Sequence, residues 1–195
     1  MHRALYVAGW GYVALCGFVV ASHGEPGLPS PTRSHPVAAA AFGGAAGEWF
    51  AQVKPSCNAV EVEVRQQQLP PPGGVDGAGY SAACYALAGK IERARTVIDA
   101  LDAGDRARAA SIVFNIGHPV ADAGDDQSAG PIMRLVVSYQ PDNYMALYHA
   151  GMSEYILGQM DLARTHLRQF LDLYRSEDGW RSNALDVLRR LDPAS

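Results

Sequence analysis

Charged side chains are scarce in this chain of 195 residues, and lysine is almost missing. Asp, Glu, Lys and Arg together make up 18% of the residues, against about 25% in an average globular protein. Only 2 of the 16 basic residues are Lys, and the net charge is −4. Without a basic excess, the chain is not expected to bind nucleic acid. The composition also excludes an acidic disordered tail, a collagen and a small disulfide-dense protein.

Motifs for catalysis and metal binding are missing as well. The chain contains no GxSxG or HExxH motif and no CxxC pair. Gly77, Gly79 and Ala82 fit the letters GxGxxA, but Pro-rich residues precede them where a dinucleotide site needs a strand. His149 and His166 are expected to be surface or groove side chains. The sequence therefore predicts no enzyme activity, no cofactor and no metal site.

Residues 1–21 have the pattern of a targeting segment. Eighteen uncharged residues run from Ala4 to Ala21, and Val19 and Ala21 suit cleavage after Ala21. The alternative is an uncleaved membrane anchor, because eighteen helical residues extend about 27 Å, close to the thickness of a bilayer core. Either way we expect an exported protein that is periplasmic or anchored to the inner membrane by residues 4–21. The excess of Arg over Lys, typical of GC-rich bacterial genomes, favours the periplasm.

Residues 22–47 are rich in Pro, Ser, Gly and Ala. They offer too little apolar surface to offset the entropy of the chain, so we expect a disordered linker. Residues 48–74 are expected to form a helical segment followed by a Pro-rich loop.

The valines within that segment fit two patterns. Val60, Val62 and Val64 alternate with glutamates, which is a strand pattern. However, Cys57, Val60 and Val64 also share one helical face, and no partner strand follows in the sequence. We therefore favour a helix with Ser56 as its N-cap.

Three cysteines are encoded, at positions 16, 57 and 84. Loss of the targeting segment would leave Cys57 and Cys84, and an even pair in an exported chain indicates one disulfide. The bond would close a loop across 27 positions and stabilise the fold by about 3–4 kcal/mol. The alternative is that both residues are buried apolar thiols.

Small and large residues recur with a period of 34 residues in the second part of the chain. Small residues stand at positions 8, 15 and 20 of the unit and a large apolar residue at position 24. In the unit that starts at Tyr144 these residues are Gly151, Gly158, Ala163 and Leu167. In the preceding unit, from Ala110, they are Gly117, Gly124, Ala129 and Met133. A first unit from Val75, one residue out of register, has Gly89, Ala94 and Ile98 at positions 15, 20 and 24.

Each position has a structural reason. Small residues at 8 and 20 let two antiparallel helices approach, and Gly at 15 permits a left-handed turn between them. In the middle unit Pro119 is expected to stop or kink the first helix near Gly117. Residues 121–127 would then form a long loop.

This pattern resembles the tetratricopeptide repeat family, most clearly in PDNYMALYHAGMSEYILGQMDLARTHLRQFLDLY, from Pro141 to Tyr174. Leu147, Glu154 and Phe170 depart from the residues that the family prefers. The resemblance implies an all-α fold, a short right-handed solenoid of helical hairpins over residues 75–191. It would comprise three repeats and a capping helix, at residues 75–109, 110–143, 144–177 and 178–191. An ordinary helical bundle is the alternative.

Tetratricopeptide repeats present the first helix of each pair on a concave face, which binds extended peptides or partner helices. Carried over by position, the resemblance places five side chains in this groove: Phe114, His118, Tyr148, Met152 and Tyr155. Core packing is the alternative for several of them. The resemblance implies a non-catalytic interaction or scaffold module of the cell envelope with a protein or peptide partner, and it leaves self-association open. An accessory subunit of an envelope enzyme assembly is the alternative, and a small hydrolase without a recognisable motif is a third.

Overall fold

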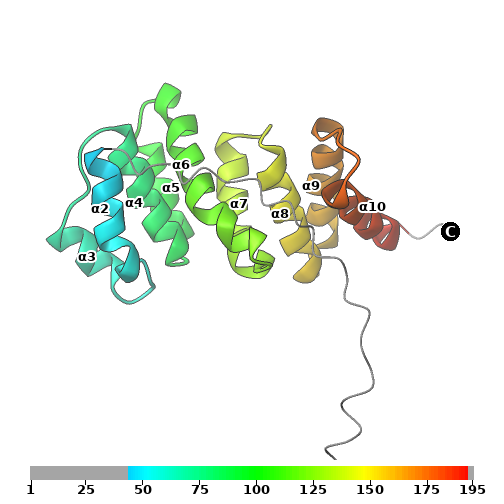
Figure 1. Cartoon of the computed structure of the whole chain (residues 1–195), viewed down its shortest axis with the longest axis horizontal. Coiled ribbons are helices and arrows are strands. Elements are labelled where there is room, and N and C mark those ends of the chain that lie inside the picture. Colours follow the sequence, from blue (N-terminus) through cyan, green and yellow to red (C-terminus); the bar gives the residue numbers. More distant parts are fainter. Residues whose placement is uncertain (1–43, 193–195) are drawn as a thin grey trace, which may run out of the picture. The chain divides into compact units, whose positions relative to one another are not determined.

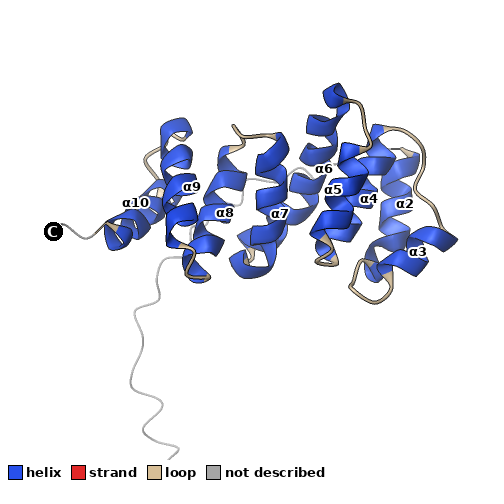
Figure 2. Ribbon diagram, turned by 180° about the vertical axis from the view of Figure 1, so that it is seen from behind, coloured by secondary structure: helices blue, strands red, loops and turns tan. Residues whose placement is uncertain are grey.

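The computed structural model describes residues 44–192, and all regular structure in that range is helical (Figures 1 and 2). The α-helices of this range are α2 (Ala45–Val53), α3 (Val62–Gln68), α4 (Val75–Leu87), α5 (Ile91–Asp99), α6 (Ala103–Asp122), α7 (Asp126–Tyr139), α8 (Tyr144–Ile156), α9 (Met160–Leu173) and α10 (Gly179–Leu191). A short 3-10 helix, η1 (Lys54–Ser56), follows α2. The predicted all-α class is confirmed for this part of the chain.

The predictions for the N-terminal region lie outside the described residues. This applies to the targeting segment 1–21 and to residues 22–43 of the predicted linker. Between residues 44 and 192, none of the helices has both the length and the apolar run that a bilayer crossing requires.

Helix α2 begins at Ala45, so residues 45–47 belong to the fold and not to the predicted linker. The helix is held by Trp49, Phe50 and Val53, which are buried, and it packs on α4. The indole nitrogen of Trp49 also donates a hydrogen bond of 2.9 Å to the carbonyl of Leu69. Residues 45–47 form the first turn of the helix that these buried side chains anchor.

Helix α3 is shorter than predicted and buries a different face. Val62 is fully buried, whereas Val60 is 86% exposed and Val64 is exposed too. Ser56 ends η1 and caps no helix. The side-chain oxygen of Asn58 instead accepts from the backbone nitrogens of residues 60 and 61, both at 3.1 Å, and turns the chain into α3.

A disulfide joins Cys57 to Cys84 across 27 positions, with the two Cα atoms 4.8 Å apart. It ties the loop between η1 and α3 to the C-terminal part of α4, and Cys84 itself is fully buried. A second link runs beside it, where the Ser81 hydroxyl donates to the Gln66 side-chain oxygen at 2.5 Å. The N-terminal segment is therefore held on α4 by covalent and polar bonds as well as by apolar packing.

The same turn joins the two helices of three successive hairpins, α4–α5, α6–α7 and α8–α9. Each turn holds a glycine with a positive φ, of 74°, 88° and 75°, at Gly89, Gly124 and Gly158. The residue after each glycine donates its backbone N–H to the carbonyl five positions earlier, which is a Schellman motif. Five positions beyond each glycine a fully buried alanine follows, at Ala94, Ala129 and Ala163. Nine positions beyond it a large side chain is fully buried, at Ile98, Met133 and Leu167.

Helix α6 differs from the prediction at both ends. It begins at Ala103, so the expected repeat boundary between residues 109 and 110 falls inside a helix. Its first turns have a partner in α4: Ala109 is fully buried there, where Gly79 leaves room for it. The Arg108 guanidinium also binds both carboxylate oxygens of Asp76 on α4, at 2.9 and 3.0 Å.

The helix also continues through Pro119 to Asp122 instead of stopping near Gly117, and the expected long loop at 121–127 is reduced to residues 123–125. Proline removes the N–H that would bond to the carbonyl of Asn115. Both residues are exposed, so water can donate to that carbonyl in place of the missing N–H. Gly117, on the buried side, packs against Ile132 of α7 and keeps the helix in place.

From α4 to α10 the helices follow one another in chain order, and each hairpin packs on the next (Figure 1). Helix α10 packs on both α8 and α9. Its N-terminus is capped by Asp178, whose side chain accepts from the backbone nitrogens of Trp180 and Arg181, at 3.1 and 3.3 Å. Trp180, Val187 and Ala184 then cover the apolar side chains of the last hairpin, including Phe170.

Candidate functional site

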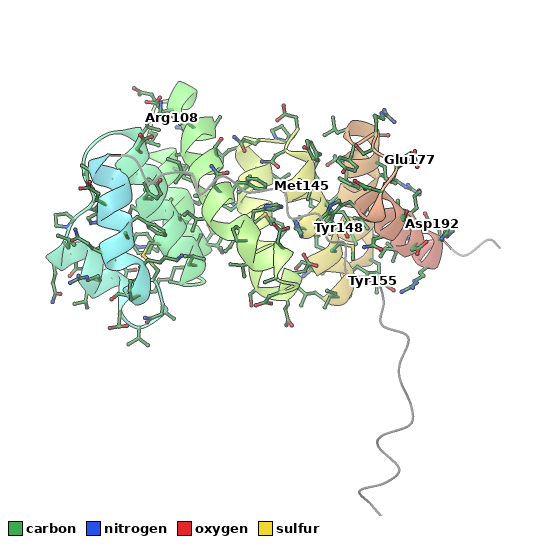
Figure 3. All side chains as sticks on the ribbon, viewed as in Figure 1. Arg108, Met145, Tyr148, Tyr155, Glu177 and Asp192 are labelled. Carbon is green, nitrogen blue, oxygen red and sulfur yellow. A yellow bond between two sulfur atoms is a disulfide. The ribbon has the colours of Figure 1, made fainter. Side chains whose placement is uncertain are left out.

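The side chains that the sequence predicts for a groove come from two neighbouring helices. Phe114 and His118 lie on α6 and stack on each other with ring centroids 4.7 Å apart. Tyr148, Met152 and Tyr155 lie on α8, which contacts α6 directly. Tyr155 lies near the C-terminal end of α8, and Tyr148 lies further up the same helix (Figure 3). Phe114, Met152 and Tyr155 are partly buried and keep part of their surface in solvent.

Tyr148 differs from that expectation because it is only 3% exposed. Its ring lies edge-on to Phe170 of α9 at 5.1 Å and to Trp180 of α10 at 5.0 Å. Burial is the main cause that raises the pKa of Tyr148 above its ordinary value. Tyr148 is therefore a core residue between three helices, and its position in a repeat does not by itself expose it.

His149 is the next residue and was expected at the surface or in a groove. Its side chain is instead 1% exposed. One ring nitrogen, Nδ1, lies 2.8 Å from a carboxylate oxygen of Asp126, in the first turn of α7. A carboxylate only accepts hydrogen bonds, so this geometry assigns the proton to Nδ1 and leaves Nε2 with a lone pair in the neutral ring.

Three side chains meet where α6 and α8 face each other: His118 and Asp122 from α6 and His149 from α8. The His118 Nδ1 atom is 3.3 Å from one Asp122 oxygen, and the His149 Nε2 atom is 3.7 Å from the other. The two imidazole rings meet edge-on, with centroids 5.0 Å apart. Burial lowers the pKa of His118 below its ordinary value; the Asp122 carboxylate opposes this shift and nearby His149 adds to it.

The cluster depends on the continuity of α6 through Pro119. His118 and Asp122 are four residues apart and share a face only while the chain stays helical between them. Had the helix ended near Gly117, Asp122 would belong to the expected loop. The His-x-x-x-Asp spacing was thus a sequence signal that the proline obscured. His149 and Asp126 are 23 positions apart, and no local spacing links them.

A second histidine and carboxylate pair lies on the next hairpin. Glu154 of α8 is fully buried, and one of its oxygens is 2.7 Å from Nδ1 of His166 on α9. The other oxygen faces Arg134 of α7 at 3.9 Å. One buried carboxylate thus links three helices. Within residues 44–192 no second histidine joins this pair to make a group of three metal-ligating side chains.

His118 belongs both to the stack with Phe114 and to the cluster with Asp122 and His149. In this cluster His149 is buried and Asp122 is 37% exposed, and the neighbouring Phe114 keeps part of its surface in solvent. Comparisons with protein-family models, with curated proteins and with solved structures found no match for the chain.

Proposed function

We propose that residues 75–191 form a tetratricopeptide-like repeat domain that binds a protein or peptide partner and has no catalytic activity of its own. The proposal is supported by the three equivalent Schellman turns, each followed by a buried alanine and a buried large side chain at the same spacing. Equivalent hairpins stacked in chain order form a repeat array, and such arrays present extended binding surfaces. Helix α10 serves as its terminal cap.

The binding surface that we propose is the face shared by α6 and α8. Phe114, Met152 and Tyr155 carry this assignment, because they are the groove positions whose hydrophobic side chains keep part of their surface in solvent; His118 is partly exposed too. Each is anchored in the core. Phe114 packs against the buried cluster that includes Val113 and Met133, and Met152 and Tyr155 pack against the buried cluster that includes Leu167 and Phe170. Aromatic and Met side chains held in this way offer apolar contact area to a partner at a small cost in conformational entropy.

We further propose that the domain works outside the cytoplasm, as part of the cell envelope. The disulfide between Cys57 and Cys84 supports this location, because structural disulfides persist mainly in oxidising compartments. A scaffold role there needs only the binding surface and the tether that residues 1–43 are expected to supply.

Affinity capture from the envelope fraction of the source cells tests the proposal. The full chain serves as bait, next to a double variant, Met152→Asp with Tyr155→Asp, that places charge on the proposed surface. The matched control is Ile156→Asp, because Ile156 is on the same helix, is 57% exposed and is not a groove position. Circular dichroism checks that all three proteins remain helical.

We expect one reproducible set of partners with the unaltered chain and with the control, and its loss with the double variant. Retention of the set by the double variant would show that this face does not bind. Equal loss in the control would indicate general apolar adhesion and would also contradict the proposal.

A further inference from the structure

The proposed binding surface gives no role to the histidine and aspartate cluster between α6 and α8. His118, Asp122 and His149 each offer one ligand-capable atom, and these atoms all lie within 4.8 Å of one another. In a tetrahedral zinc site with ligands about 2.0–2.1 Å from the metal, neighbouring ligand atoms are about 3.3 Å apart. The distance of 3.3 Å from His118 Nδ1 to one Asp122 oxygen matches that spacing, and His149 Nε2 lies 3.7 Å from the other oxygen of the same carboxylate.

The orientation of His149 also suits metal binding. Its Nδ1 atom is hydrogen-bonded to the Asp126 carboxylate, which places the lone pair of the neutral ring on Nε2, and Nε2 lies 3.7 Å from an Asp122 oxygen. Nε2 is buried and has no hydrogen-bond partner within residues 44–192. A histidine that ligates a metal almost always donates its other N–H to a carboxylate, carbonyl or water. Asp126 supplies that carboxylate here and positions the ring.

We propose that His118, Asp122 and His149 bind one divalent transition-metal ion, with zinc as the best fit. Two imidazoles and one carboxylate favour metals such as zinc over calcium or magnesium, which prefer oxygen ligands alone. The Asp122 side chain is 37% exposed, so the ion can enter from solvent along that side. Three protein ligands leave a fourth position for water or for a group from a partner. This inference goes beyond partner binding and is independent of it.

Metal binding would join the second hairpin to the third. His118 and Asp122 come from α6, His149 comes from α8, and Asp126 lies on α7 between them. An ion at this point would bridge two successive hairpins next to Phe114, which stacks on His118. The alternative is that the same side chains hold the helices together only through hydrogen bonds and ion pairs, and zinc titration separates the two.

The test uses the full chain, purified without a histidine tag and treated with a chelator. Zinc is titrated in competition with a chromophoric chelator, and cobalt is added in a parallel sample to record the visible absorption of a four-coordinate site. The variants are His118→Gln and Asp122→Asn. Their matched controls are His166→Gln, from the other histidine and carboxylate pair, and Asp161→Asn, whose side chain is 99% exposed.

We expect one equivalent of zinc to bind to the unaltered chain and to both controls. Since removal of a group that only orients a ligand costs about 10–100-fold in metal affinity, loss of a ligand should cost at least about tenfold. Zinc should also raise the thermal unfolding midpoint of the unaltered chain and the controls more than that of the two variants.

Two results would overturn the metal site. One is the absence of stoichiometric zinc binding to the unaltered chain. The other is a zinc affinity of the two ligand variants that equals that of the unaltered chain. This would place the zinc elsewhere, for example on histidines of residues 1–43 that all the proteins share. If His118→Gln fails to fold, Asp122→Asn decides the question, because Asp122 is substantially exposed and its change to Asn alters charge but hardly alters shape.

Discussion

Gly151 is the position at which the packing of the last hairpin can be tested most directly. It lies on α8 where that helix crosses α9. A Cβ atom added there would lie 2.7 Å from Leu167 Cγ, 2.8 Å from its Cδ2 and 3.3 Å from its backbone nitrogen. Carbon atoms in contact prefer separations of about 3.5–4.0 Å. Leu167 is fully buried, so it cannot move away without displacing its neighbours.

Gly151→Ala should therefore destabilise the protein, although alanine is the better helix former. Overpacking of this kind costs about 1–3 kcal/mol, and two contacts under 3.0 Å to a buried side chain place this variant in the upper part of that range, about 2–3 kcal/mol. The helix propensity of Ala returns about 0.8–1 kcal/mol. The net loss expected in the free energy of unfolding is about 1–2 kcal/mol. The free energy of unfolding of a small protein falls by about 2 kcal/mol per molar urea, so the urea midpoint of unfolding should fall by about 0.5–1 M.

Gly104→Ala is the matched control because it makes the same chemical change in an open position. A Cβ atom on Gly104, in the first turn of α6, would meet nothing within 4 Å. The variant should be more stable than the unaltered chain by about 0.4–1 kcal/mol, since alanine restricts the unfolded state. Urea unfolding followed by far-ultraviolet circular dichroism, with the disulfide intact, compares the two. A Gly151→Ala protein as stable as the unaltered chain would refute the close crossing of α8 and α9.

Two further predictions concern the disulfide and a buried tyrosine. Changing Cys57 and Cys84 to Ser should lower the free energy of unfolding by about 3–4 kcal/mol, because the unfolded chain is no longer closed across 27 positions; an unchanged urea midpoint would contradict this. Burial and then a hydrogen bond to Asp99 raise the pKa of Tyr139 to about 12. The unfolded state therefore loses this proton first, and stability should fall as the pH rises from about 10 to about 12. Tyr139→Phe should reduce that fall in urea unfolding at alkaline pH, and an identical pH dependence would show that Tyr139 does not contribute.

The hairpins were predictable because their determinants are local and recur. A left-handed residue is needed wherever a helix ends in a Schellman turn, and glycine is the residue that adopts this conformation most easily. Gly89, Gly124 and Gly158 therefore stood out in the sequence. The alanine and the large apolar residue that follow each of them are placed by helical spacing, which the sequence also shows.

Helix α6 shows where local rules failed. Pro119 predicted a break, but the bond that it removes belongs to an exposed carbonyl, and the buried side of the helix is held by packing on α4 and α7. The early start at Ala103 has the same kind of cause, because Ala109 finds its place against Gly79. In both cases contacts with distant residues outweigh the preference of the segment itself.

The candidate site was predicted only in part. The repeat positions of Phe114 and His118 predict a groove location, and in the structure the two rings stack on each other along α6. Tyr148 was assigned by the same reasoning, yet Trp180 covers it from α10. A position within a repeat indicates the side of the helix that a residue occupies, whereas its exposure depends on which later element packs over that side.

The sequence by itself determined the helical class of the described region and the three turns within it, because turn glycines and helical periodicity act over a few residues. It also singled out Cys57 and Cys84, the pair that the structure joins. Only the tertiary structure decided which residues form the cluster of His118, Asp122 and His149. That cluster requires α6 to run unbroken through Pro119 and to face α8, and both conditions follow from packing between segments far apart in the chain.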